Sequence, residues 1–309
     1  MQGRATDLKA MITAKRLREL PLHLMILPGA VIVFIYHYIP LGGLVMAFQK
    51  YIPTKGIFGS EWVGLRNFTY IFSLPSTMDV FWNTLFIAMM KIVAGLVAPI
   101  VTALLLNEIG KAAFKRTVQT LIYLPHFLSW TILAGILIDI LSPGQGIVNK
   151  ALGLADIEPI FFLGDNNWFP YTIVISNEWK EFGFSTIIYL AALSGVDPSL
   201  YESAVIDGAG KWRQTWHITL PGIRPVIILL MTLSLGQILN AGFEQVFNLY
   251  SPYVYESGDI IDTMVYRMGL ENAQYSLATA VGLLKSVVSL AMISVSYLLA
   301  YRLANYRIF

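Results

Sequence analysis

Long runs of apolar residues alternate with short polar segments along this chain. Crossing about 30 Å of hydrocarbon takes roughly 20 helical residues, so apolar runs of that length indicate membrane-spanning helices. Six runs qualify, at residues 22–48, 81–106, 117–141, 168–193, 220–242 and 277–304. The pattern therefore predicts an all-α integral membrane protein with six transmembrane helices.

Composition supports a membrane protein and excludes several other classes. Of the 309 residues, 56% are hydrophobic and 13% are charged, whereas a soluble domain has roughly 25% charged residues. A net charge of +2 is too small to indicate nucleic-acid binding, so we expect no nucleic-acid partner. The chain has no cysteine, which excludes disulfides and thiolate metal sites.

Basic residues are distributed unequally between the two sets of connecting segments. Thirteen Lys and Arg residues lie in the N-terminal tail, in residues 107–116 and 194–224, and at the C-terminus, whereas five lie in the opposite connections. Residues 1–20 form a polar, basic tail, and the first apolar run is too long for a signal-peptide core. Because basic loops stay inside, we expect both termini in the cytoplasm.

The segment between the fourth and fifth runs carries the densest local signals. Asp197 can cap a helix whose first residue is Pro198, and Gly208 and Gly210 can end it through a positive φ. Trp212 and basic residues follow, and Trp216 lies one turn further on; such residues suit the lipid headgroup region. The sequence predicts a short helix projecting from the membrane, followed by an interfacial segment.

Six positions across this segment form a spaced pattern, namely Glu202, Ala204, Gly208, Ile218, Leu220 and Pro221. In identity and spacing, the pattern resembles the EAA loop of the inner-membrane permease subunits of binding-protein-dependent ABC importers. Residues 207–209 with Trp216 are similar to the sugar-importer branch, while Ser203 stands where the family more often has Ala. The resemblance covers about residues 79–304, which is most of the chain, and includes residues 83–84, 105–108, 189–193 and 240–247. These segments are similar to those of multi-sugar, complex-oligosaccharide and aldouronate permeases.

The resemblance implies a fold, a location and a set of partners. It implies the type I ABC importer membrane-domain fold with a cytoplasmic coupling helix, in a multi-pass protein of the bacterial cytoplasmic membrane. The chain then divides into a tail at 1–20, a first helix and extracytoplasmic loop at 21–78, and the transmembrane domain at 79–305, with the EAA loop at 197–221. The implied partners are a second, homologous permease in a heterodimer, two ATPase subunits, an extracytoplasmic solute-binding protein, membrane lipid and an oligosaccharide. The residues implied to couple to the ATPase are Glu202, Ser203, Ala204, Asp207, Gly208 and Ala209.

Energy for transport is expected from a separate subunit. The chain has no G-x-x-x-x-G-K-[ST] phosphate loop, so we expect it not to be an enzyme and to hold no cofactor itself. ATP and Mg²⁺ would belong to the partner ATPase. None of the four histidines forms an H-x-x-x-H pair, so we expect no metal site.

Polar residues within the apolar runs are candidates for the substrate path. Ionisable groups are costly in hydrocarbon and normally face a bundle interior or a water-filled path, while amides and aromatic rings suit sugar hydroxyls and ring faces. Glu178 and Glu181 are three residues apart and share a helix face, from which Lys180 points away. The candidates are Lys91, Glu178, Trp179, Lys180, Glu181, Asn240, Phe243, Glu244, Gln245 and Lys285.

Two alternatives remain open for these residues. Lys–Glu pairs can simply hold helices together, or the three lysines can suit an acidic, uronate-containing oligosaccharide. A different class of function is an autonomous, proton-coupled secondary carrier that uses Glu178, Glu181 or Glu244 as its proton sites. The EAA loop would have no task in such a carrier.

Overall fold

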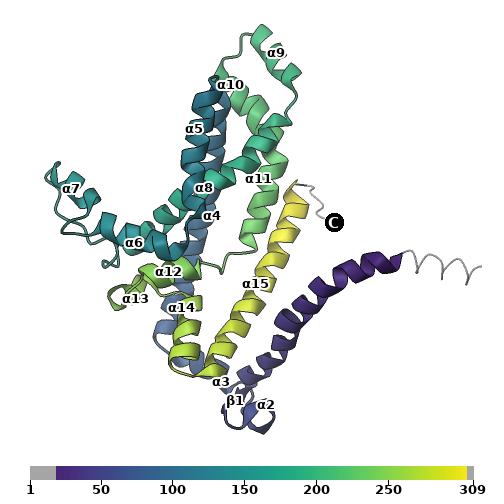
Figure 1. The fold of residues 1–309 in the computed structure, drawn as a ribbon, viewed down its shortest axis with the longest axis vertical. Helices are drawn as coiled ribbons and strands as arrows, with labels where there is room; N and C mark the ends of the chain where they lie inside the picture. The colour runs from purple at the N-terminus through teal and green to yellow at the C-terminus, as the bar shows by residue number, and fades with distance from the viewer. Residues whose placement is uncertain (1–18, 305–309) are drawn as a thin grey trace, which may run out of the picture.

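The computed structural model describes residues 19–304, and side chains as far as Leu298. Long helices run between two ends of the molecule (Figure 1). At one end lie α9 (Pro198–Ile206) and α10 (Lys211–Gln214), and at the other lie β1 (Gln49–Lys50), α2 (Gly56–Gly59) and α3 (Arg66–Ser73). Most of the tail predicted at residues 1–20, and Arg307 near the C-terminus, lie outside the described residues.

Four helices are long and apolar enough to cross a membrane, at Glu19–Phe48, Ser76–Glu108, Lys211–Leu235 and Tyr275–Leu298. The first, here called the first helix, ends in a π-helical turn (Phe34–Tyr38) and a 3-10 stretch, η2 (Ile39–Phe48). The second is α4 (Ser76–Glu108), the third joins α10 (Lys211–Gln214) through η4 (Thr215–Thr219) to α11 (Leu220–Leu235), and the last is α15 (Tyr275–Ala304). These four match the first, second, fifth and sixth predicted runs in position.

The third predicted run, residues 117–141, is not one straight span. The chain forms α5 (Ala112–Tyr123), η3 (Leu124–Phe127) and α6 (Trp130–Leu141), and the helices on either side of the break differ in direction by 106°. Pro125 disfavours a continued helix at the residue before it, and the Ser129 hydroxyl accepts a hydrogen bond from the Ile132 N–H to begin α6. Apolar composition alone does not reveal this break.

The predictions for the fourth and fifth runs also need correction. α8 (Phe169–Ser194) is long enough to cross a membrane. It is not among the helices that are apolar enough to do so, because Glu178, Lys180 and Glu181 lie in its middle. α11 ends at Leu235 rather than continuing to residue 242, and a turn with Gly242 at φ +92° leads into a separate helix, α12 (Phe243–Leu249). The six-span count is therefore not confirmed: the described residues contain four such helices, or five if the bent pair is one span.

Short elements fill the connections. β1 (Gln49–Lys50) and β2 (Glu61–Trp62) pair antiparallel, with Lys50 opposite Glu61. The remaining elements are α2 (Gly56–Gly59), α3 (Arg66–Ser73), α7 (Ile147–Gly153), α9 (Pro198–Ile206), η5 (Pro252–Val254), α13 (Tyr255–Gly258), α14 (Ile261–Tyr266) and η6 (Arg267–Glu271).

Helix α4 is the common wall of the buried core. Its Ile87 packs with residues of α6, α8 and α12, its Val80 with α14 and α15, and its Ala103 with α8 and α11. The most apolar part of the first helix has no buried residue, and this helix meets α15 through η2. α4 therefore contributes to all three buried clusters, whereas the apolar surface of the first helix is not covered by the rest of the described chain.

Candidate functional site

Helix α9 begins and ends at marked residues. Asp197 accepts a hydrogen bond of 2.9 Å from the Ser199 N–H, which holds the pKa of Asp197 below its ordinary value, and Pro198 is the first helical residue. Gly208 has φ +74°, as the sequence predicts. Gly210 does not: its φ is −68°, because it serves as the N-cap of α10.

Some residues of the EAA loop form the hydrogen bonds at the end of α9, and others face outward. The Ser203 hydroxyl donates to the Ser199 carbonyl at 2.9 Å, the Asp207 N–H donates to the Ser203 carbonyl at 3.0 Å, and the Ala209 N–H donates to the Ala204 carbonyl at 2.8 Å. These bonds end the helix and start the return toward α10.

The outward surface of α9 combines a carboxylate with exposed apolar side chains. No residue of α9 is buried. Glu202, Val205 and Ile206 share one helix face because they are three and four residues apart, and Ile206 is 86% exposed. Exposed apolar side chains around a carboxylate suit contact with another protein surface.

Three contacts that the sequence did not indicate hold α9, the turn after it and α10 to one another and to α4. The Tyr201 hydroxyl lies 3.0 Å from the Thr219 hydroxyl of η4, and the Gln214 amide donates to the Ala209 carbonyl at 2.8 Å. Lys211 of α10 pairs with Glu108 at the end of α4 at 3.1 Å. Their partners depend on how the chain turns between α9 and α10, which local spacing does not specify.

In the interior, Lys91 and Gln245 join three helices. Lys91 of α4 donates to the Ala241 carbonyl at 2.6 Å and to Gln245 Oε1 at 2.5 Å. The Gln245 amide of α12 donates to the Ile173 carbonyl at 2.7 Å and to the Ser176 hydroxyl at 2.8 Å, both on α8. Gln245 is buried, and all its polar atoms are used within the protein.

The charges of α8 form a second network, with His126. Lys180 donates to the His126 carbonyl at 2.8 Å and to Glu181 at 3.1 Å, and Glu181 pairs with His126 Nδ1 at 2.7 Å. The His126 ring stacks on Phe184 at 4.0 Å. The expectation that Lys180 points away from both glutamates is therefore wrong for Glu181. This network fixes η3, where the third run breaks, against α8.

Glu178 and Trp179 take different positions on α8. Glu178 lies against Gly95 of α4, and one of its oxygens is buried without a hydrogen-bond partner among the described residues. Trp179 is 42% exposed. No group of three His, Asp or Glu side chains in the described part of the chain is arranged to hold a metal ion.

A cavity of about 820 Å³ brings together three of the predicted substrate-path residues, namely Asn240, Phe243 and Lys285. The cavity is also lined by Asp262, Tyr266 and Tyr275, which were not predicted because they lie outside the apolar runs. Lys285 pairs with Asp262 at 2.5 Å, and the Phe243 ring packs on Tyr266 at 5.6 Å. Glu244, another predicted substrate-path residue, is exposed and does not line this cavity.

The molecule thus combines α9, a projecting helix bonded to η4 at one end, with a polar and aromatic cavity among apolar helices. Residues 95–305 match the family described as binding-protein-dependent transport system inner membrane component. The chain belongs to this family. Its membership confirms the permease predicted from residues 197–221, and its several apolar helices agree with a multi-pass membrane protein.

Relatives and solved structures agree with this assignment. The permease is 44% identical to the polygalacturonan/rhamnogalacturonan transport system permease protein YteP of Bacillus subtilis (strain 168), over 94% of this chain and 89% of that protein. It is also 44% identical to protein LplB of the same organism, over 89% of this chain and 87% of that protein. A crystal structure of a bacterial ABC transporter involved in import of the acidic polysaccharide alginate contains a chain that is 37% identical, with a TM-score of 0.87, covering 94% of this chain and 99% of that one. A second structure, the alginate ABC transporter in complex with an alginate pentasaccharide-bound periplasmic protein, matches with 38% identity and a TM-score of 0.85, covering 92% of this chain and 95% of that one. These similarities confirm the predicted resemblance to sugar-transport permeases.

Proposed function

We propose that this permease is a membrane subunit of an ATP-driven importer of oligosaccharides. The observation that carries the proposal is α9, a short helix with no buried residue that places Glu202 beside exposed Val205 and Ile206. Relatives and structural neighbours named for polygalacturonan and alginate transport support an oligosaccharide, and an acidic one in particular, as the substrate.

Helix α9 is the proposed docking surface for a separate ATPase subunit. Glu202 pairs with a basic side chain of the ATPase, and the neighbouring apolar side chains are covered in the same contact. Movement of the docked surface passes through the Tyr201–Thr219 and Gln214–Ala209 hydrogen bonds into α10 and α11. A short helix bonded to a long one can thus convert ATPase closure into displacement of membrane helices.

The cavity lined by Asn240, Phe243 and Lys285 is the proposed sugar path. Amide and charged groups can bond sugar hydroxyls and carboxylates, while Phe243 and Tyr266 offer ring faces to the C–H surface of a sugar. Its volume of about 820 Å³ lies within the range of ligand-binding cavities. A second permease completes the path, and an extracytoplasmic binding protein delivers the sugar at the β1 end.

The proposed subunit is not an enzyme and binds no nucleotide. The sequence has no phosphate-binding loop of the G-x-x-x-x-G-K-[ST] type, so ATP and Mg²⁺ are held by the partner ATPase. The proposed orientation places α9 and both termini in the cytoplasm, in accordance with the thirteen-to-five distribution of basic residues.

Substitution of Glu202 tests the coupling. Glu202→Ala should leave membrane insertion intact and lower ATP-driven oligosaccharide uptake at least about tenfold, because a charge-assisted contact is lost. Glu158→Ala, which removes an exposed carboxylate after α7, is the matched control and should transport normally. Unchanged ATP-coupled uptake in Glu202→Ala would refute the docking role.

Two further measurements separate the proposal from a secondary carrier and check its orientation. Uptake in vesicles should require ATP and should not follow an imposed proton gradient alone. A tag at Lys211 should be accessible from the cytoplasm, and one at Asp156 from outside. Proton-driven uptake by the chain alone would favour the carrier.

A further inference from the structure

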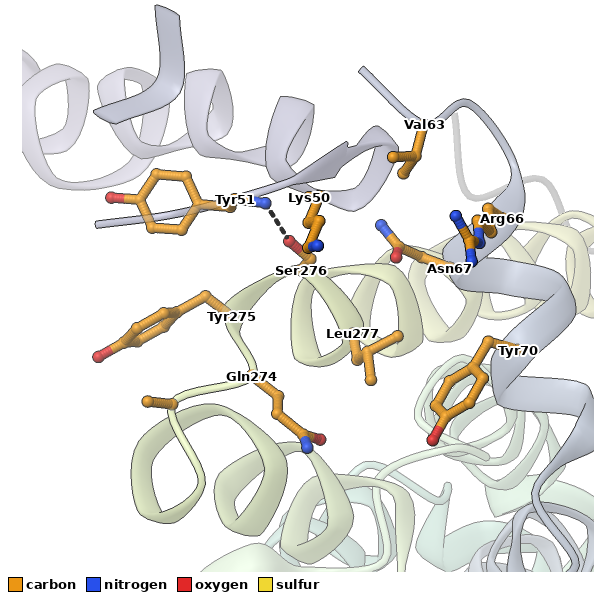
Figure 2. A pocket seen from close by; sticks show the side chains of 11 residues that line it. Lys50, Tyr51, Val63, Arg66, Asn67, Tyr70, Gln274, Tyr275, Ser276 and Leu277 are labelled. Atoms are coloured by element: carbon orange, nitrogen blue, oxygen red, sulfur yellow. Dashed lines mark hydrogen bonds between the residues drawn. The ribbon is translucent and has the colours of Figure 1, made fainter. Parts of the chain in front are cut away.

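A second pocket, distinct from the cavity, lies at the β1 end. Its volume is about 400 Å³, and it forms where β1 and α3 meet the turn before α15. Figure 2 shows Tyr51 and Tyr275 at one end, Arg66 and Tyr70 at the other, and Lys50 between them. The Tyr51 N–H donates to the Ser276 hydroxyl at 2.9 Å, which holds the two walls together.

The pocket is cationic. Lys50 and Arg66 are both exposed, and none of its eleven lining residues is acidic. The five ion pairs of the described chain involve other side chains, and Lys50 forms none with Glu61, its cross-strand neighbour. Two exposed cations in a concave site free of carboxylates favour an anionic ligand.

The rest of the lining suits a sugar rather than a small inorganic anion. The rings of Tyr51 and Tyr275 meet edge to face at 6.0 Å, and Tyr70 is half exposed at the other end. Tyrosine offers both a ring face for the C–H surface of a pyranose and a hydroxyl for hydrogen bonding. A volume of about 400 Å³ exceeds what a lone phosphate or sulfate needs and lies within the range of small-molecule sites.

The pocket also adjoins the proposed sugar path. Tyr275, the first residue of α15, lines both the pocket at the β1 end and the cavity that contains Phe243 and Lys285. The Lys285–Asp262 pair lies on the cavity side of this shared residue. This shared wall favours a step of transport over a docking surface for another protein.

We propose that the pocket around Lys50 and Arg66 is a subsite for the carboxylate of a uronate unit, occupied before an acidic oligosaccharide passes Tyr275 into the cavity. The inference rests on the proposed function and deepens it by assigning a site to the carboxylate of the acidic substrate. Arg66 can hold a carboxylate through two parallel N–H bonds, while Lys50 supplies a point charge.

Binding of matched sugars to the assembled transporter in nanodiscs tests the subsite. The probes are trigalacturonate and its carboxyl-reduced form, a galactose trimer with the same linkages. Lys50→Gln and Arg66→Gln should each weaken trigalacturonate binding about tenfold and leave binding of the reduced trimer unchanged. Lys150→Gln, which removes an exposed lysine of α7, is the control and should bind both trimers as the parent does.

Several outcomes would overturn the subsite. In the first, Lys50→Gln and Arg66→Gln bind trigalacturonate as tightly as the parent does, and in the second they lose affinity equally for both trimers. In the third, the parent itself does not bind trigalacturonate, and in the fourth the variants lose only docking of the binding protein. If the parent still imports a neutral oligosaccharide with ATP, only the subsite fails. If the parent imports no oligosaccharide, the proposed function fails as well.

Discussion

Helix α9 and the network around Gln245 use polar side chains in opposite ways. Most bonds of α9 join residues close in sequence, such as Asp197 with Ser199 and Ser203 with Ser199, and leave its outer face open. Gln245 instead connects α12 with α8 and α4, which are distant in sequence, and is buried. A region bonded locally can change its partner contacts without unfolding the bundle, whereas a region bonded across helices cannot.

The largest effect is expected at Gln245. Gln245→Ala leaves Lys91 with one hydrogen-bond partner, the Ala241 carbonyl, and removes two bonds to α8. Leaving buried polar groups unpaired should lower the free energy of unfolding by about 2–5 kcal/mol. Thermal unfolding in detergent measures this, with Gln237→Ala, at an exposed position, as the control. Equal stability of the two variants would show that the Gln245 network does not hold the helices together. Altered sugar selectivity in the assembled Gln245 variant would show that Gln245 contacts the substrate instead.

Gly208 provides the converse test, in which function changes and stability does not. No atom lies within 4 Å of where a Cβ would sit, so only the φ of +74° opposes Gly208→Val. That strain costs about 1–3 kcal/mol at the end of α9 and should lower uptake about tenfold to a hundredfold. Because no residue of α9 is buried, the unfolding temperature of the helix bundle should not change. Gly210→Ala, at φ −68°, should behave normally. An unfolding temperature lowered as much as in Gln245→Ala would show that α9 belongs to the cooperative core.

A smaller effect separates cavity residues from their neighbours. Asn240→Ala removes an amide from the cavity wall, so uptake should fall roughly threefold to tenfold, the equivalent of one neutral hydrogen bond. Glu244→Ala is the control, because Glu244 is exposed and does not line the cavity. Concentration-dependent uptake measures both. A larger loss for Glu244 would place the sugar path on the other side of α12.

The smallest effect is expected at Asp197. Asparagine caps helices as well as aspartate does, so Asp197→Asn should retain uptake, while Asp197→Ala should lower it less than Gly208→Val does. The pKa of Asp197 is held below its ordinary value of 3.8, so its capping contribution is fully present above that value and lost only as pH falls through the lower folded value. Titration of Asp197 should therefore cause no change in uptake between about pH 8 and about pH 6.

The sequence was informative where marker residues act on their immediate neighbours. Asp197, Pro198 and Gly208 predicted both ends of α9, and charge-free apolar runs located four spanning helices. The break before α6 and the early end of α11 were missed, because both are fixed by residues distant in sequence: Lys180 and Glu181 of α8 hold His126 at the break, and Lys91 of α4 holds the Ala241 carbonyl after α11. The cavity was only partly predicted for the same reason: Asp262, Tyr266 and Tyr275 reach it from α14 and α15 after the chain has turned outside the predicted runs.

The short helix α6 bears on how the protein is made. Its 12 residues extend about 18 Å, less than the hydrocarbon thickness of about 30 Å, and it packs against α12. Residues 243–249 are synthesised long after residues 130–141, so the surface that holds α6 is missing when α6 leaves the ribosome. We expect residues 117–141 to enter the bilayer first as one continuous apolar segment and to bend only once both α8 and α12 are in place. Nascent chains arrested before residue 243 would then expose the end of α6 on the opposite side of the membrane from α5.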